Sequence, residues 1–330
     1  MECIKSSEKN IRNSCIDFIK MIACIFVIHI HYPISGKVGE GINCIAQFAV
    51  MYFFMVSGYY LRGVDKDKLK KRIRHIGLLC LISTLLYLLI DYVLFSIFGH
   101  SDSWIKIRFS LGRIVRFLVV NDLSNISAGH LWYLYALLYI YILYYVLLLG
   151  EKIYRRLDIP LLITSIFLIM INLVLFAKGV NWHYTGNWLI TGFPFVSIGY
   201  LANKLKLPKI KWGYGFLIIL LILVCYAYGL EWGSHLGCII LALFLVVLAI
   251  QHPTILNNVF SRFALKCSQN IYILHVAIGR LINIICVYLL KITGNGILIF
   301  LMTTFVSCLV AWLLEIVFHK KMRIGLSCRS

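Results

Sequence analysis

The chain has 330 residues, of which 61% are apolar and only 14% are charged, and its mean hydropathy is +0.89. A soluble domain of this size cannot bury so large an apolar fraction, so the composition predicts a polytopic membrane protein. The net charge of +19 on its own would suggest a nucleic-acid partner. The basic residues, however, lie in short gaps between apolar runs, which is a signal of membrane topology, so we expect no nucleic-acid partner.

Apolar runs long enough to cross a bilayer recur along the whole chain. They predict an all-α, polytopic membrane bundle of about ten transmembrane helices, in a single domain over residues 1–330. The predicted spans lie near 16–34, 42–61, 76–98, 129–149, 160–177, 186–203, 213–230, 234–251, 269–290 and 296–318. Of the 32 lysines and arginines, 23 lie in the connections that share a side with the N-terminus and seven in those on the opposite side. This asymmetry predicts that both termini are cytoplasmic.

The longest outer connection, residues 99–128, carries a mixed pattern. Apolar and basic side chains alternate between Ile105 and Leu118. That pattern favours an amphipathic segment at the membrane interface, or a re-entrant one, that covers the outer mouth of the bundle.

The first predicted span carries four ionisable side chains, Asp17, Lys20, His29 and His31. Such groups are costly in a membrane, so they usually face the protein interior and serve a function. At about 100° per residue, Asp17, Lys20 and His31 share one side of the helix and His29 lies roughly opposite Lys20. A neutral imidazole can take a proton from a hydroxyl, so we predict His31 as a general base. The alternative is an Asp17–Lys20 ion pair near the interface, with His31 reaching the outer interface.

Two further features lie near the predicted cytoplasmic end of the second and third spans. Ser57 and Gly58 are small residues that allow close helix packing, which is the alternative to a role in a site. Residues 66–75 form the densest basic cluster of the chain, with Lys71, Arg72 and Arg74 nearest the membrane. This cluster either anchors the protein to anionic lipid or binds a phosphorylated cytosolic ligand.

Histidines also occur in two later spans. His130, Trp132 and Tyr133 open the fourth span, where they suit either an interfacial aromatic belt or the binding of a sugar or alcohol. His275 and Arg280 lie inside the ninth span and are expected to face the bundle interior. Asp91 and Glu315 also lie in apolar runs, and the sequence does not indicate their partners.

The order of these motifs resembles membrane-bound acyltransferase family 3 over nearly the whole chain. The motifs are Ile-Asp-x-x-Lys-x10-His, Phe-Phe-Met-Val-Ser-Gly-Tyr, the basic cluster, His-Leu-Trp-Tyr-Leu and Ile-Tyr-Ile-Leu-His. The chain resembles the branch that contains the O-acetyltransferase of enterobacterial common antigen. The membrane portion of the serine racemases of D-serine-type vancomycin resistance is similar as well.

The resemblance implies transfer of an acyl group, usually acetyl, from cytosolic acyl-CoA to a hydroxyl of a cell-surface or lipid-linked glycan. Acetyl-CoA is then a co-substrate, and neither a bound cofactor nor a metal is expected. His31 matches the catalytic histidine and Lys20 the basic residue before it, and Asp17 is grouped with His31 as catalytic. The acyl-CoA is expected at Lys20, Lys71, Arg72 and Arg74, and the acceptor at His130, Trp132, Tyr133, Ser57 and His275.

Two other functions stay open at this point. As in the racemases, the chain could be a transporter of serine or another small solute, which moves its solute without acyl-CoA. An inactive scaffold is disfavoured because Lys20 and His31 are both present. In each case we expect a multi-pass protein of a bacterial inner or plasma membrane, surrounded by membrane lipids.

Overall fold

The computed structural model describes residues 12–97, 104, 106, 108–123, 128–150, 157–202, 209–292 and 296–327. Every regular element in these residues is a helix, which confirms the predicted all-α bundle. In chain order they are α1 (Ser14–His31), α2 (Lys37–Ala46), α3 (Phe48–Tyr59), α4 (Lys66–Ile97), α6 (Leu111–Val120), η2 (Gly129–Leu131), α7 (Trp132–Leu149), α9 (Asp158–Ala177), α10 (Trp182–Thr185), η3 (Trp188–Gly192), α11 (Phe193–Ala202), α12 (Gly213–Ala227), α13 (Glu231–Gln251), α14 (Val259–Ile284), η4 (Ile285–Leu289) and α15 (Gly296–Ser327).

Eight helical segments of the described residues are long and apolar enough to cross a membrane. They cover 14–31, 37–59, 66–97, 129–149, 158–177, 231–251, 259–289 and 296–317. Two shorter apolar helical segments, 188–202 and 213–227, lie where the sixth and seventh spans were predicted. The second span is divided at Gln47 into α2 and α3. The first helix ends at His31 rather than at residue 34. Tyr32 precedes Pro33, and the residue before a proline disfavours helical geometry.

Interior and surface helices of the bundle differ in burial. Within an apolar window of 18 residues, 56% of the α1 span and 67% of the α13 span is buried, against 22% of the α4 span and 17% of the α15 span. The side chains that α4 exposes include Leu78, Leu81, Ile82, Leu85 and Leu89. An apolar surface is unfavourable in water and matches lipid acyl chains, so the outer faces of these helices are suited to lipid.

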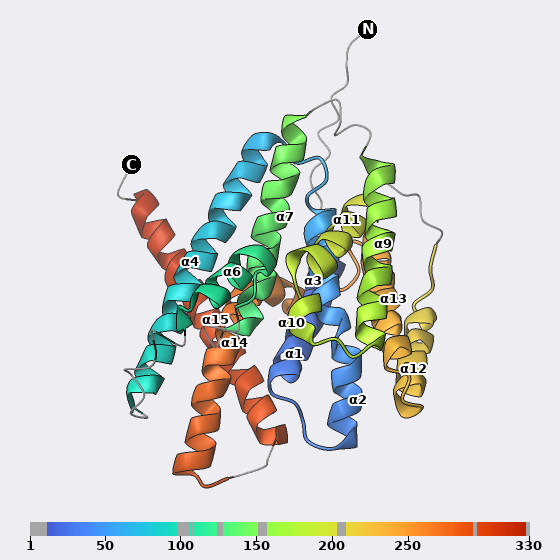
Figure 1. The fold of residues 1–330 in the computed structure, drawn as a ribbon. Coiled ribbons are helices and arrows are strands. Elements are labelled where there is room, and N and C mark those ends of the chain that lie inside the picture. Colours follow the sequence, from blue (N-terminus) through green and yellow to red (C-terminus); the bar gives the residue numbers. More distant parts are fainter. Residues whose placement is uncertain are drawn as a thin grey trace.

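The long helices alternate in direction. Figure 1 places the beginnings of α4 and α9 and the end of α7 at the same end of the bundle. This arrangement agrees with the predicted order of crossings, in which the basic connections share one side. That this side faces the cytoplasm is still a prediction from the distribution of charge.

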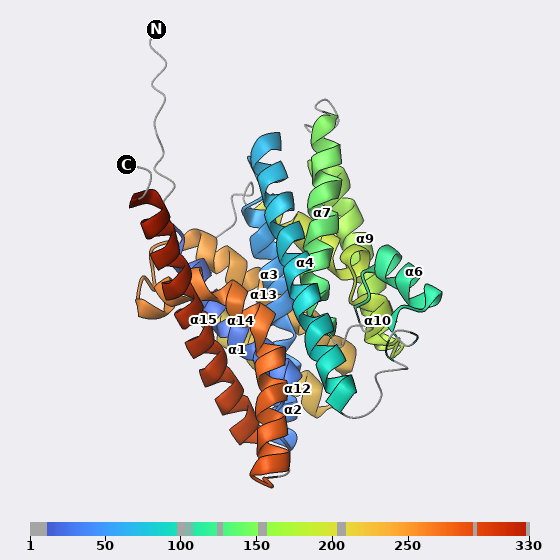
Figure 2. The ribbon, with the colours of Figure 1, turned by 90° about the vertical axis from the view of Figure 1, so that its left-hand side faces the viewer.

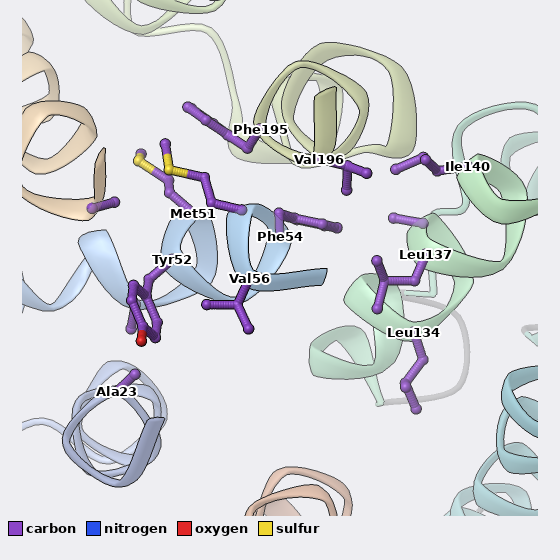
Figure 3. Packing of buried hydrophobic residues seen from close by; sticks show 14 of the residues in the cluster. Ala23, Met51, Tyr52, Phe54, Val56, Leu134, Leu137, Ile140, Phe195 and Val196 are labelled. Atoms are coloured by element: carbon purple, nitrogen blue, oxygen red, sulfur yellow. The ribbon is translucent and has the colours of Figure 1, made fainter. Parts of the chain in front are cut away.

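The centre of the bundle is built around α3. Figure 3 shows Phe54 pointing toward Val196 of α11 and Ile140 of α7, while Tyr52 points the other way, toward Ala23 of α1. All five side chains belong to one buried apolar cluster. The α3 helix therefore joins α1 to the α7–α11 side of the bundle.

Glycines permit the closest of these contacts, between α3 and α11. A Cβ atom on Gly58 would lie 1.9 Å from the carbonyl oxygen of Val196, and one on Gly199 would lie 1.8 Å from that of Met55. No other residue fits either position without separating the two backbones. The packing interpretation of the Ser57-Gly58 pair therefore holds for Gly58.

The outer connection contains α6, which runs across the long helices instead of along them (Figures 1 and 2). None of its side chains is buried, and five apolar ones are exposed, Leu111, Ile114, Val115, Leu118 and Val119. A short helix with an exposed apolar face agrees with the interfacial segment that the sequence predicts. Residues 99–103, 105, 107 and 124–127 of the predicted segment lie outside the described residues.

Two polar anchors attach this connection to the bundle. Asp91 of α4 accepts hydrogen bonds from Arg108 at 2.7 and 2.9 Å and from the indole of Trp104 at 2.9 Å. Asn121, in the left-handed region with φ 49°, donates to the carbonyl of Trp132 and accepts from the backbone N–H of Trp188. The intramembrane carboxylate of Asp91 is therefore a structural anchor with a bidentate arginine partner.

Candidate active site

Helix α1 contributes side chains to two separate cavities. His31 lines a cavity of about 410 Å³, here called the His31 cavity, together with Phe53, Tyr133 and Arg280. Lys20, three turns earlier on the helix, lines a cavity of about 580 Å³, the Lys20 cavity. The predicted polar face of α1 therefore places its cation and its histidine in two different spaces.

The two cavities meet at three aromatic residues. Phe53, Tyr133 and Tyr272 line both of them. The ring of Tyr133 lies 6.1 Å from that of Phe53 and 5.4 Å from that of Tyr272, centroid to centroid. These three rings therefore belong to the walls of both cavities.

Three histidine rings lie together beside the His31 cavity, and two of them, His31 and His130, line it. The ring centroid of His31 lies 5.9 Å from that of His130 and 5.2 Å from that of His275, and the last two are 5.2 Å apart. His130 and His275 are buried, whereas His31 keeps exposed surface, which faces the cavity that it lines. Among the described residues, no group of three or more His, Cys, Asp and Glu side chains is arranged to hold a metal ion.

Backbone carbonyl groups fix the tautomers of the two buried rings. Nδ1 of His275 lies 2.8 Å from the carbonyl oxygen of Tyr272, and Nε2 of His130 lies 3.3 Å from that of Ile273. A carbonyl oxygen can only accept, so each of these nitrogens carries the hydrogen and the other nitrogen of each neutral ring keeps a lone pair. Nε2 of His275 and Nδ1 of His130 are buried and have no hydrogen-bond partner in the described structure. Two unsatisfied acceptors therefore lie beside His31.

His29 faces a different part of the protein, as the helical geometry predicts. Its ring is buried against Phe300 of α15, with the centroids 5.4 Å apart. Its Nε2 accepts a hydrogen bond from the backbone N–H of Ile34 at 3.3 Å. His29 lines neither of the two cavities. Of the two histidines near the end of α1, only His31 reaches a space that a substrate could enter.

The Lys20 cavity is lined by basic side chains from two helices. Lys20 of α1 and Lys71, Arg72 and His75 of α4 all border it. Arg72 donates to the carbonyl of Tyr60 at 2.7 Å, which holds its guanidinium at the cavity wall. Arg74, which the sequence groups with Lys71 and Arg72, is exposed and does not line this cavity.

Asp17 acts as a partner of two cations. Its carboxylate lies 2.9 Å from Nε of Arg12 and 3.4 Å from Nζ of Lys20, and its side chain is buried. Asp17 lines neither cavity, so it has no access to a substrate that lies near His31. The geometry is that of the ion pair which the sequence left open as the alternative for Asp17 and Lys20.

The predicted acceptor residues divide between the cavities. His130, Trp132 and Tyr133 line the His31 cavity, and His275 joins them through its ring contacts. Ser57 lies in the Lys20 cavity instead, where its hydroxyl is 3.1 Å from that of Tyr133. Ser57 thus lies with the basic residues and not with the predicted acceptor site.

The His31 cavity also has polar residues that sequence reasoning did not identify. Gln47, Asn172, Thr191 and His235 line it. Asn172 and His235 belong to α9 and α13, which are far apart in sequence, and Nε2 of His235 lies 2.8 Å from Oδ1 of Asn172. A polar residue inside an apolar run was the only signal available, and it does not reveal which helices come together.

A comparison with protein families agrees with this architecture. The model of acyltransferase family 3, described as an acyltransferase domain, matches residues 13–316, which is nearly the whole chain. No curated protein and no solved structure matches the chain. The matched range contains both cavities, the three histidines and the basic residues of α4. The chain therefore belongs to acyltransferase family 3 and is a membrane-bound acyltransferase.

Proposed function

We propose that the protein transfers an acyl group, acetyl in the simplest case, from acyl-CoA to a hydroxyl group of a cell-surface or lipid-linked glycan. The observation that carries this proposal is the junction of two unlike cavities at Phe53, Tyr133 and Tyr272. One cavity is basic and suits an anionic donor, and the other contains a histidine and suits a hydroxylated acceptor.

The donor side of the proposal rests on charge. The phosphates of CoA are anions, and Lys71 and Arg72 can pair with them at the wall of the Lys20 cavity. Lys20 borders the same cavity from α1 and can contact the pantetheine arm or a phosphate. Asp17 partly neutralises the charge of Lys20, which favours a role for Lys20 in positioning the donor over a role as an anion-binding site. The thioester then reaches His31 past the ring of Tyr133.

The transfer itself requires one proton acceptor. His31 takes the proton of the acceptor hydroxyl as its oxygen attacks the thioester carbonyl carbon. The tetrahedral intermediate collapses with cleavage of the carbon–sulfur bond, and the proton passes from the His31 imidazolium to the CoA thiolate. The products are an ester and free CoA.

The other two histidines support His31 in this step. An imidazolium has two N–H groups, and burying either of them without a hydrogen-bond acceptor costs free energy. Nε2 of His275 and Nδ1 of His130 are unsatisfied acceptors in rings that contact His31. We therefore assign them to orienting His31 and stabilising its protonated form, in addition to any contact that His130 makes with the acceptor.

The oxyanion of the intermediate needs a donor. Arg280 of α14 lines the same cavity as His31, and its guanidinium can stabilise a developing negative charge. Trp132 and Tyr133 line the cavity as well, where aromatic rings can stack on a sugar face while the tyrosine hydroxyl stays polar.

The test uses the purified full chain in nanodiscs with radiolabelled acetyl-CoA and no acceptor. Slow hydrolysis and release of CoA are expected in the wild type and should be lost in His31→Ala. If the wild type neither binds nor cleaves acetyl-CoA, the proposal fails. Uptake of labelled serine into vesicles that contain the protein and no acyl-CoA would then establish the transport function instead.

A further inference from the structure

The His31 cavity has a second group of polar side chains, which the proposed mechanism does not use. This group, here called the amide cluster, consists of Gln47, Asn172, Thr191 and His235. It comes from the α2–α3 junction, α9, η3 and α13, whereas the three histidines come from α1, η2 and α14. The cavity therefore has two groups of polar side chains that come from different helices, and aromatic and aliphatic side chains make up much of its remaining wall.

A chain of hydrogen bonds fixes the polarity of the amide cluster. The hydroxyl of Thr191 donates its single hydrogen to the carbonyl oxygen of Thr185 at 2.7 Å. It must therefore accept from Asn172, whose Nδ2 lies 3.2 Å away, and this sets the orientation of the amide. Oδ1 of Asn172 then faces Nε2 of His235 at 2.8 Å, so Nε2 carries the hydrogen.

The cluster keeps unused donors and acceptors after these bonds are made. Asn172 has a second amide N–H, and Nδ1 of His235 is a buried lone pair without a partner in the described structure. Gln47 is half-buried, and its side-chain amide forms no hydrogen bond within the described residues. These groups carry no formal charge, so they suit hydroxyl and amide groups better than a carboxylate or a phosphate.

Aromatic rings accompany the cluster. The ring of His235 stacks on Phe176, with centroids 4.2 Å apart and planes inclined by 8°, and Phe176 lines the same cavity. Trp132 and Trp182, whose rings are 5.5 Å apart, also line it. Flat apolar surfaces beside uncharged donors and acceptors match a ring that has both C–H faces and hydroxyl groups.

We propose that the amide cluster is a second binding subsite, which holds a further hydroxyl or amide group of the acceptor while His31 takes the proton of the reacting hydroxyl. The acceptor is then an uncharged ring with several polar groups, and an alcohol with a single hydroxyl is a poor substrate. This inference rests on the proposed acyl transfer.

The test compares two soluble probes in nanodiscs with radiolabelled acetyl-CoA. Methyl β-D-glucopyranoside presents a ring with several hydroxyls, and cyclohexylmethanol presents a ring of the same size with one. The wild type should acetylate the glucoside at least about tenfold faster, since a second hydrogen bond made in the complex is worth roughly that factor. Gln47→Leu and Asn172→Leu should remove this preference while acetylation of cyclohexylmethanol and hydrolysis of acetyl-CoA stay within about twofold of the wild type.

A matched pair of variants separates binding from folding. His235→Phe keeps a ring against Phe176 and should also lose the preference, whereas His29→Phe changes a buried histidine that lines neither cavity and should keep it. Equal rates for the two probes in the wild type would overturn the subsite, as would a preference that survives in Gln47→Leu and Asn172→Leu. Hydrolysis without transfer to either probe would overturn it as well. Loss of wild-type hydrolysis would instead overturn the proposed function itself.

Discussion

His31 of α1 and His275 of α14 lie with their ring centroids 5.2 Å apart, although 244 positions separate them in the chain. The buried ring presents a lone pair on Nε2, because its Nδ1 is hydrogen-bonded to backbone carbonyls. The exposed ring lines a cavity. A fixed acceptor beside an accessible imidazole is the arrangement that the proposed role of His31 as a general base requires.

The first prediction concerns the two histidines of α1. His31→Ala should lower acyl transfer and acetyl-CoA hydrolysis by at least about 100-fold, the usual contribution of a general base. His29→Ala should retain both activities within about twofold, since His29 contacts Phe300 and lines neither cavity. The measurement compares initial rates at equal amounts of folded protein, and size-exclusion chromatography determines those amounts. An equal loss in both variants would contradict the assignment of the base.

The second prediction tests His275 as a positioning residue. His275→Phe keeps the ring volume but removes the Nε2 acceptor, so kcat should fall by about tenfold or more while KM for acetyl-CoA stays unchanged. The protonated form of His31 then loses a partner, so the acidic limb of the pH–rate profile should move to lower pH. A parallel loss of expression and thermal stability, with an unmoved pH profile, would show that His275 serves only packing.

The third prediction concerns the basic residues of α4. Lys71→Ala and Arg72→Ala should each raise KM for acetyl-CoA by about three- to tenfold, because each loses one charge-assisted contact at the wall of the Lys20 cavity. Lys70→Ala is the control, since that side chain is exposed and lies outside the cavity. The effect should shrink with dephospho-CoA donors if these side chains bind the 3′-phosphate. If all three variants behave alike, the cluster acts as a general surface charge.

Sequence periodicity is sufficient to predict the helical bundle and to place His29 and His31 on different sides of α1. Both side chains lie on α1, so the geometry of a single helix decides which side each of them faces. The same helical geometry groups Asp17 with His31, whereas in the structure Asp17 pairs with Arg12 and Lys20 and lines neither cavity. A helical wheel shows on which side of a helix a residue lies, but not which neighbouring residues pack against that side.

Tertiary pairing accounts for what the sequence could not predict. Asp91 is visible in the sequence as an intramembrane carboxylate, but its partner Arg108 lies in a different segment, and the alternating pattern around Arg108 does not show which helix it contacts. Asn172 and His235 meet only because α9 and α13 pack together. The sequence assigns Ser57 to the acceptor site, whereas in the structure Ser57 lines the Lys20 cavity. Each of these outcomes depends on which helices are neighbours.

The last prediction concerns the backbone contact between α3 and α11. Gly58→Ala and Gly199→Ala each add a methyl group where a carbonyl oxygen lies within 2 Å of the ideal Cβ position, so the two helices must separate. The expected cost is about 1–3 kcal/mol of stability, measured by thermal unfolding in detergent, with a loss of activity because α3 also carries Phe53 at the junction of the cavities. Gly112→Ala on α6 is the control, since nothing lies within 4 Å of its Cβ position. If all three variants unfold at the wild-type temperature, the α3–α11 contact is looser than the structure indicates, and the position of the aromatic junction must depend on other helices.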